Sequence, residues 1–194
     1  MNFLAHIYLS GNNEEKIIGN YIADSIKGKD LNQFSPGIQK GILLHRAIDH
    51  YTDHHPIVKN GLVLLRPELG KYSGVALDIY FDHFLARAWK RFHTEDFRVY
   101  TYRIMDVIGN YYHLLPGHSK SFFDYAKQTD RLYRYKDIDG IDEVFRGMHK
   151  RIKVENTMHL AQASFIKHYE QLQFLFSDYF PQLINFVDDQ ADLE

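Results

Sequence analysis

Two carboxylates stand one helical turn apart inside an apolar stretch of this sequence, at Asp78 and Asp82 within residues 75–85. Like charges at this spacing repel by roughly 0.2–0.5 kcal/mol even in water, and an unpaired buried carboxylate costs far more. A positive partner is therefore expected opposite them. Because His83 adds a nitrogen ligand, that partner is either a divalent metal ion or an Arg or Lys from another helix.

A second pair, His45 and Asp49, is also spaced by one turn and shares one helix face, with Asp53 a further turn along. These residues are either a hydrogen-bonded pair on an exposed face or metal ligands held by a rigid helix. In the second case Arg46 is available to hold an anionic substrate.

Two more residues of the same chemical types come earlier in the chain. Asp24 follows an apolar stretch and is either a solvent-facing residue or a ligand. His6 interrupts a mostly apolar segment and is either a hydrogen-bonded core histidine or a ligand. Helical bundles build metal sites from inward-pointing carboxylates and imidazoles on facing helices, so we expect a metal site among these residues, all before residue 84.

Helical periodicity along the whole chain supplies the elements that position these residues. We expect helices at residues 2–9, 12–27, 36–55, 56–69, 73–93, 94–115, 119–135, 141–152 and 156–180. Pro181 is expected to end the last helix, before an acidic tail at residues 188–194 that frays. Since no alternating β pattern, repeat or linker occurs, the sequence predicts one all-α domain over residues 1–194, with eight or nine helices.

Composition narrows the class of protein. The 194 residues, 45% of them hydrophobic, with 14 Tyr and 14 Phe, indicate a folded globular domain. The absence of Cys excludes disulfides and thiolate chemistry and leaves His and carboxylate ligands, which suit Mn, Fe, Mg or Zn. A poor signal peptide and the lack of a transmembrane-length run predict a cytoplasmic protein without a membrane partner. The net charge of −2 argues against nucleic-acid binding.

The second half of the chain has a basic stretch, in which Arg146, Lys150, Arg151 and Lys153 occur without an acid between residues 144 and 153. It is either a solvated helix face or a positive patch for an acidic or phosphorylated partner. A glycine-rich phosphate loop, a nucleophile elbow and an HExxH motif are all missing from the sequence, so P-loop, serine-hydrolase and zincin chemistry lack support.

Several short motifs occur in a fixed order along the chain. They are Met1–His6, Gly19-Asn20, Ala23-Asp24, Gly41-Ile42, His45-Arg46, Ile48-Asp49, Thr52-Asp53, Leu77-Asp78, Asp82–Leu85, Arg134-Tyr135, Asp137, Asp139 and Gly147-Met148. In these motifs the sequence resembles the bacterial acyl carrier protein phosphodiesterases, also called ACP hydrolases. The resemblance runs from Met1 to about Arg151, and residues 179–181 show a further, weaker similarity.

The resemblance implies a metal-dependent hydrolase of fatty acid biosynthesis, manganese-dependent in the best-known case. Such an enzyme releases 4′-phosphopantetheine from the serine of holo acyl carrier protein and regenerates the apo form. The resemblance also implies a fold distantly related to HD-domain phosphohydrolases. However, this chain has no adjacent His-Asp pair, and Asp82-His83 has the reverse order.

From the residues and the resemblance together we predict a site and a partner. The predicted catalytic residues are Asp24, His45, Asp49 and Asp78, with Arg46 holding the phosphate. The predicted metal ligands come from Asp24, His45, Asp49, Asp78, Asp82, His6 and His83, and the ion is Mn²⁺, with Mg²⁺ or Fe²⁺ as alternatives. Because carrier proteins are strongly acidic, Arg146, Lys150, Arg151 and Lys153 are the predicted docking residues.

Two other functions compete with this prediction. One is an HD-like phosphohydrolase with the same metal site that acts on a nucleotide or another small phosphoester. The other is a non-catalytic helical binding module, in which the Asp and His residues pair with Arg and Lys in the core.

Overall fold

The structure is a computed structural model that describes residues 3–191. These residues form eleven α-helices with four short 3₁₀ turns, and none of them lies in a β-strand. The helices of seven or more residues are α1 (Phe3–Leu9), α2 (Glu14–Ile22), α3 (Pro36–His54), α4 (Pro56–Leu69), α5 (Ser73–Arg87), α7 (Phe97–Asn110), α8 (Gly117–Gln128), α10 (Ile138–Arg151) and α11 (Ala161–Ala191). Two single turns, α6 (Trp89–Phe92) and α9 (Arg131–Arg134), complete the set. The prediction of an all-α fold is confirmed.

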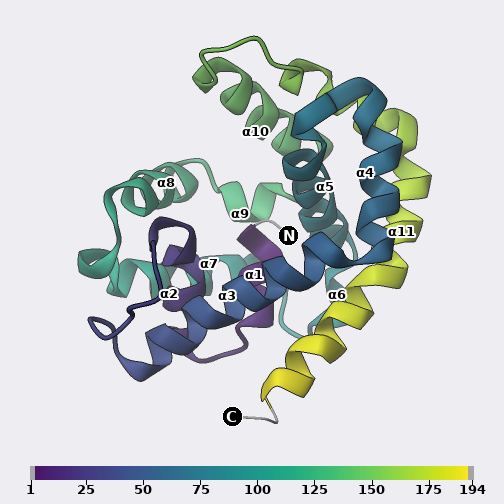
Figure 1. Cartoon of the computed structure of the whole chain (residues 1–194). Helices are drawn as coiled ribbons and strands as arrows, with labels where there is room; N and C mark the ends of the chain where they lie inside the picture. Colours follow the sequence, from purple (N-terminus) through teal and green to yellow (C-terminus); the bar gives the residue numbers. More distant parts are fainter. Residues whose placement is uncertain (1–2, 192–194) are drawn as a thin grey trace.

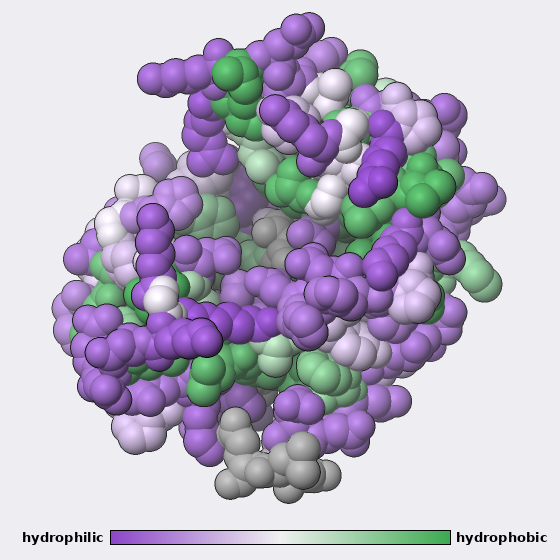
Figure 2. Space-filling model, in the orientation of Figure 1, coloured by the Kyte–Doolittle hydropathy of each residue, from purple (hydrophilic) through white to green (hydrophobic). Residues whose placement is uncertain are grey.

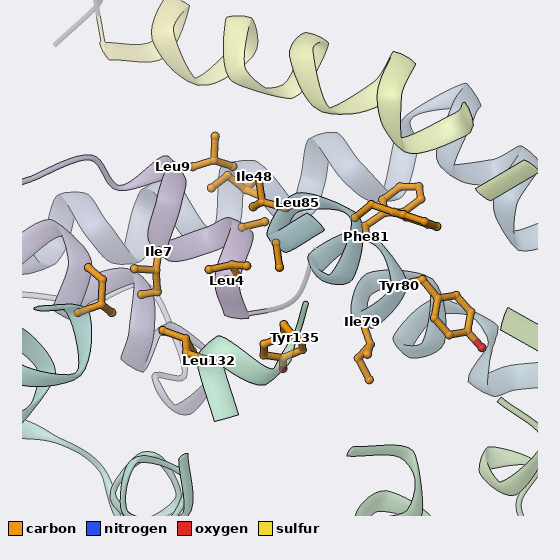
Figure 3. Packing of buried hydrophobic residues seen from close by; sticks show 14 of the residues in the cluster. Leu4, Ile7, Leu9, Ile48, Ile79, Tyr80, Phe81, Leu85, Leu132 and Tyr135 are labelled. Atoms are coloured by element: carbon orange, nitrogen blue, oxygen red, sulfur yellow. The ribbon is translucent and has the colours of Figure 1, made fainter. Parts of the chain in front are cut away.

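Helix α5 is the central element of the fold. It packs against α1, α4, α10 and α11, and the long α11 runs beside α4 along one edge of the molecule, while α2, α3, α7 and α8 form the opposite part (Figure 1). Figure 3 shows Leu4 of α1 next to Leu85 of α5 inside the hydrophobic core. α5 is apolar on most of its faces, as the sequence predicts for a buried helix.

The N-terminus of α1 is held by a carboxylate of α5. The two Asp82 oxygens accept hydrogen bonds from the backbone N–H groups of Leu4, at 2.7 Å, and Ala5, at 3.1 Å. Orphan N–H groups at a helix start carry a partial positive charge, so they stabilise an anion. Backbone donors of α1 therefore stand opposite Asp82, where the sequence predicts either a metal or a basic side chain.

Helices α2 and α3 cross with their backbones in contact at Gly19 and Gly41. A Cβ atom on Gly41 would lie only 2.8 Å from Gly19 Cα and 2.8 Å from the backbone nitrogen of Asn20. Real Cβ atoms essentially never come this close to another atom. The crossing brings Asn20, next to Gly19, close to His45, one turn after Gly41.

Helix α3 starts at a strong sequence signal. Ser35 accepts a hydrogen bond from the N–H of Ile38 as the N-cap, and Pro36 occupies the first turn, where its missing N–H costs nothing. The helix then runs unbroken to His54. It therefore holds His45 and Asp49 one turn apart, as their spacing predicts.

The structure corrects several predicted helix ends. α2 stops at Ile22 and continues as a 3₁₀ turn, Ala23–Ser25, whereas the prediction extended to residue 27. α7 covers Phe97–Asn110 rather than residues 94–115. Differences of this size arise because helix ends depend on caps and local packing.

The prediction that Pro181 ends the last helix is wrong, because α11 passes through Pro181 and reaches Ala191. Pro removes one backbone hydrogen bond, but Leu183 and Val187 are buried beyond it and continue the apolar stripe of the helix. Residues 188–191 of the predicted frayed tail are helical, and residues 192–194 lie outside the described part of the chain. None of the helices in the described part of the chain is both long and apolar enough to span a bilayer.

Candidate active site

A pocket of about 460 Å³ lies where α1, α2, α3, α5 and α8 meet, and the molecular surface is hollowed between α8 and α5 (Figure 2). Its polar lining residues are His6, Asn20, Asp24, Ser25, His45, Asp49, Asp53, Asp78, His118 and Ser119. The other lining residues are Phe3, Ile7, Tyr21, Val75 and Phe122. The structure thus gathers five of the predicted site residues, from four different elements, around one cavity.

Two histidines and a carboxylate form the centre of the pocket. His45 Nε2 lies 3.2 Å from Asp49 Oδ2, and His6 Nε2 lies 3.2 Å from the other oxygen of the same carboxylate. The two imidazole rings stack with their centroids 4.1 Å apart. Asp24 approaches from the 3₁₀ turn after α2, with Oδ1 3.2 Å from His45 Nε2. The His45–Asp49 contact favours the prediction that this pair works together, but inside a pocket rather than on an open helix face.

Asn20 connects the two histidines and fixes the orientation of one ring. Its buried amide nitrogen donates to the carbonyl oxygen of His6 and to Ser10 Oγ, both at 2.9 Å. A carbonyl can only accept, so the amide oxygen of Asn20 must face His45, where it lies 2.8 Å from Nδ1. His45 therefore carries a proton on Nδ1 and presents Nε2 to the pocket. Hydrogen bonds of this kind orient the imidazole ligands of metal sites.

The protonation states of His45, Asp49 and Asp24 depend on one another. Burial disfavours the imidazolium form of His45, but the hydrogen bonds that its Nε2–H donates to the Asp24 and Asp49 carboxylates overcome this and raise the pKa of His45 to about 9. Burial also disfavours the Asp49 carboxylate, yet its contacts with His45 and His6 hold its pKa well below the usual value. The hydrogen bond to His45 lowers the pKa of Asp24. In the absence of a metal, the protonated His45 is thus the cation between two carboxylates.

His6 differs from His45 because it lacks good partners. Only 4% of it is exposed, and although its Nε2 lies 3.2 Å from Asp49 Oδ1, neither ring nitrogen makes a hydrogen bond of good geometry within the part of the chain that the structure describes. Burial lowers the pKa of His6, so the ring is neutral at neutral pH. A buried imidazole with an unused lone pair beside a carboxylate is what a metal site requires before the ion binds.

The donor set fits a divalent metal ion. One ligand atom each from His6, His45 and Asp49 lie within 4.8 Å of one another. Two imidazoles and a carboxylate suit Mn²⁺, Fe²⁺ or Zn²⁺, whereas Mg²⁺ prefers oxygen ligands. Asp24 and Asp78 line the same pocket and can complete the coordination or act on a bound water.

Three predicted site residues lie outside this pocket. Asp82 is fully buried and caps α1, and burial raises its pKa to about 7. His83 Nδ1 is 2.8 Å from the carbonyl oxygen of Tyr135, and burial lowers the pKa of this ring to about 4. Arg46 donates to the backbone carbonyls of Ile26 and Gly28 at 3.2 and 2.9 Å, so it holds the loop after Asp24. The structure gives these residues supporting contacts and does not place them at the two stacked histidines.

Sequence reasoning missed several pocket residues. Asn20 belongs to a motif of the resemblance, but its type alone predicts no role at a metal site. His118 and Ser119 lie in the first turn of α8, at the Pro116-Gly117 break, and no periodicity relates them to the other polar residues of the pocket, which all come before residue 79. Only the tertiary packing of α8 next to α2 brings them there.

Comparison with known proteins adds to this geometry. A family model described as acyl carrier protein phosphodiesterase matches residues 1–183. The chain belongs to this family. The acyl carrier protein phosphodiesterases of Escherichia coli O6:H1 (strain CFT073) and O45:K1 (strain S88) are each 30% identical to it, over 98% of this chain and 100% of their own. The protein from Escherichia coli strain K12 / DH10B is 30% identical over 95% of this chain and 96% of its own. No solved structure matches the chain.

Membership in the acyl carrier protein phosphodiesterase family confirms the resemblance and identifies the chain as an enzyme. The interpretation as a non-catalytic module is not supported, because Asp24 and Asp49 contact histidines in a pocket, whereas that interpretation predicts ion pairs with Arg and Lys in the core. The distant relation to HD-domain phosphohydrolases stays a prediction.

Proposed function

We propose that this acyl carrier protein phosphodiesterase hydrolyses the phosphodiester between 4′-phosphopantetheine and the serine of holo acyl carrier protein, using a divalent metal ion held by His6, His45 and Asp49. Mn²⁺ is the ion that we propose, with Fe²⁺ as the alternative; the two imidazole ligands make Mg²⁺, the other predicted alternative, less suited to this site. The products are the apo carrier protein and free 4′-phosphopantetheine. The proposal includes the predicted cytoplasmic location and a place in fatty acid biosynthesis.

The observation that carries the metal dependence is the charge of the pocket. Four aspartates line it, at positions 24, 49, 53 and 78, and its described lining includes no Lys or Arg. Such a pocket repels a phosphodiester anion unless a cation intervenes. A divalent ion, when bound, neutralises the phosphoryl oxygens and acidifies a water.

The protein's own residues supply positioning and proton transfer. Asn20 keeps the proton on His45 Nδ1, so Nε2 is the atom that must release its proton when an ion binds. Asp24 or Asp78, whichever does not bind the ion, accepts a proton from the attacking water. The serine oxygen of the carrier protein needs a proton as it leaves, and His118, on α8, is the pocket residue that we assign to this task.

The carrier protein is proposed to dock on the basic end of α10. Arg146, Lys150 and Arg151 of this helix and Lys153, two residues after its end, are all exposed. Arg146 is partly neutralised by Asp142, whose Oδ2 lies 2.6 Å from its Nε, so the other three residues contribute most of the patch. Complementary charge of this kind mainly accelerates the encounter with an acidic partner.

The direct test follows the mass of holo acyl carrier protein during incubation with the metal-stripped enzyme after Mn²⁺ is added back. We expect loss of the phosphopantetheine mass, and loss of both activity and Mn²⁺ binding in folded Asp49→Asn protein. Asp106→Asn, which changes an exposed aspartate on α7, is the matched control and should behave as wild type. A carrier mass that stays unchanged with metal-loaded enzyme would refute the proposal.

The small-phosphoester alternative shares the metal site but not the docking surface. It predicts that bis(p-nitrophenyl) phosphate or a nucleotide diester is cleaved with a higher kcat/KM than holo acyl carrier protein. Our proposal predicts the opposite order.

A further inference from the structure

Three aromatic side chains line the pocket together with the histidines and aspartates. Phe3 of α1 meets Tyr21 of α2 edge to face, with ring centroids 5.2 Å apart, and meets Phe122 of α8 in the same way at 5.3 Å. All three rings are half-buried, pack on the hydrophobic core and line the pocket. We call Phe3, Tyr21 and Phe122 the aromatic wall.

The aromatic wall offers apolar surface and not hydrogen bonds. Phe3 and Phe122 have no polar atoms in their side chains, and the hydroxyl of Tyr21 donates to the carbonyl oxygen of Ser119 at 2.7 Å. Burial also raises the pKa of Tyr21 far above neutrality, so this residue is no acid or base for the reaction. Hydrolysis of a phosphodiester requires no apolar surface, so the aromatic wall is expected to bind the organic part of the substrate.

We infer that the aromatic wall is the binding subsite for the pantetheine arm, and that it receives the two methyl groups of the pantoyl unit. This inference rests on the proposed function. In 4′-phosphopantetheine, a quaternary carbon with two methyl groups follows the phosphate ester oxygen after a single CH₂. A phosphate placed beside the histidines therefore brings this branched apolar group against a wall of the same small pocket.

The size of the pocket indicates which side of the phosphodiester enters it. A cavity of about 460 Å³ is in the range that accepts a small molecule, and a folded carrier protein must stay outside. The flexible pantetheine arm enters the pocket along the aromatic wall, while the serine of the carrier protein stays at the pocket entrance and is joined there to the phosphate. The wall is thus expected to select for the arm and against phosphodiesters without a branched apolar group.

Phe122 is the residue of choice for a test, because it lies on α8 and not on the helices that carry His6 and Asn20. The variants are Phe122→Ala and Phe122→Leu, and Phe174→Ala on α11, which removes a ring that is 72% exposed, is the matched control. Each Mn²⁺-loaded enzyme is assayed with holo acyl carrier protein and with bis(p-nitrophenyl) phosphate, which has no pantetheine arm. Melting temperatures show whether each variant is folded.

We expect Phe122→Ala to raise KM for holo acyl carrier protein about tenfold, as for the loss of one or two methyl-sized contacts, with a smaller effect on the arm-free diester. Phe122→Leu should restore KM to within about threefold of wild type, because branched methyl groups need an apolar surface and not a ring. Phe174→Ala should leave KM unchanged for both substrates.

Other outcomes contradict the inference in recognisable ways. Wild-type cleavage of holo acyl carrier protein with equal KM values for Phe122→Ala and Phe174→Ala would refute the wall and leave the proposed function intact. Failure of Leu to substitute for Phe, together with stronger competition by AMP than by 4′-phosphopantetheine, would assign the rings to stacking on a base. Failure of the wild-type enzyme to cleave the carrier would overturn the proposed function and the inference together.

Discussion

The strongest quantitative prediction concerns the proton on His45 in the metal-free protein. After a chelator has removed the metal, the pH is raised from about 6 to about 10. We expect His45 to lose its proton at a much higher pH than an ordinary histidine, which titrates near 6.5. The reason is the position of its Nε2, 3.2 Å from the carboxylates of both Asp24 and Asp49. Replacement of His45 by Gln removes the titrating group while keeping a polar side chain.

The magnitude and its sign follow from linkage. The pKa of His45 is about 9 in the folded protein against 6.5 for an ordinary histidine. Since a tenfold change in proton affinity corresponds to about 1.4 kcal/mol, the protonated ring contributes about 3 kcal/mol to the free energy of unfolding. The folded pKa is the higher one, so this contribution is complete below about pH 6.5 and is lost as the pH rises through about 9.

Two measurements test this prediction. The Cε1–H resonance of His45, assigned with the His45→Gln variant, should titrate with a pKa near 9. Denaturant unfolding should show that the free energy of unfolding of wild type, relative to that of His45→Gln, decreases by about 3 kcal/mol between about pH 6 and about pH 10. The comparison with His45→Gln is needed because lysines and tyrosines titrate in both proteins over this range, so that their effect on stability cancels. A His45 pKa at or below 6.5 would refute the ion-pair geometry described for the pocket.

Three further predictions follow from other contacts. Gly41→Ala should destabilise the protein by roughly 1–3 kcal/mol in denaturant unfolding and weaken Mn²⁺ binding, because its Cβ meets the backbone at Gly19. Asp82→Ala should cost about 1–3 kcal/mol, since it leaves two buried N–H groups of α1 unpaired, while Asp82→Asn that stays folded should bind Mn²⁺ in calorimetry; loss of binding would make Asp82 a ligand. Lys150→Glu with Arg151→Glu should raise KM for holo acyl carrier protein at low salt and leave hydrolysis of bis(p-nitrophenyl) phosphate unchanged; an unaltered KM would refute docking at α10.

Helical spacing alone was enough to predict part of the pocket. His45 and Asp49 are four residues apart on one helix, and the structure shows them in contact. Helix starts are also strongly marked in the sequence by caps and prolines, as at Ser35 and Pro36, and these signals together with helical periodicity predict the all-α class.

The predicted residues that lie outside the pocket share one physical cause. Asp82 contacts backbone N–H groups, and His83 and Arg46 contact backbone carbonyls. Every residue carries such groups, so a pattern of side-chain types gives no sign of them, whereas a metal or a basic side chain is an obvious partner to propose. The same reasoning explains the length of α11, because the burial of Leu183 that offsets the effect of Pro181 depends on tertiary packing.

The contact of α2 with α3 at Gly19 and Gly41 makes these positions sensitive to mutation in a particular way. Backbone atoms meet there, so a larger residue at either position has no neighbouring side chain that can change its rotamer to make room. In a library of all single substitutions selected for activity, we therefore expect both positions to tolerate as few replacements as His6 and His45. A ranking of residues by intolerance to substitution would therefore group these two glycines with the active-site residues, although neither carries a side chain that can react.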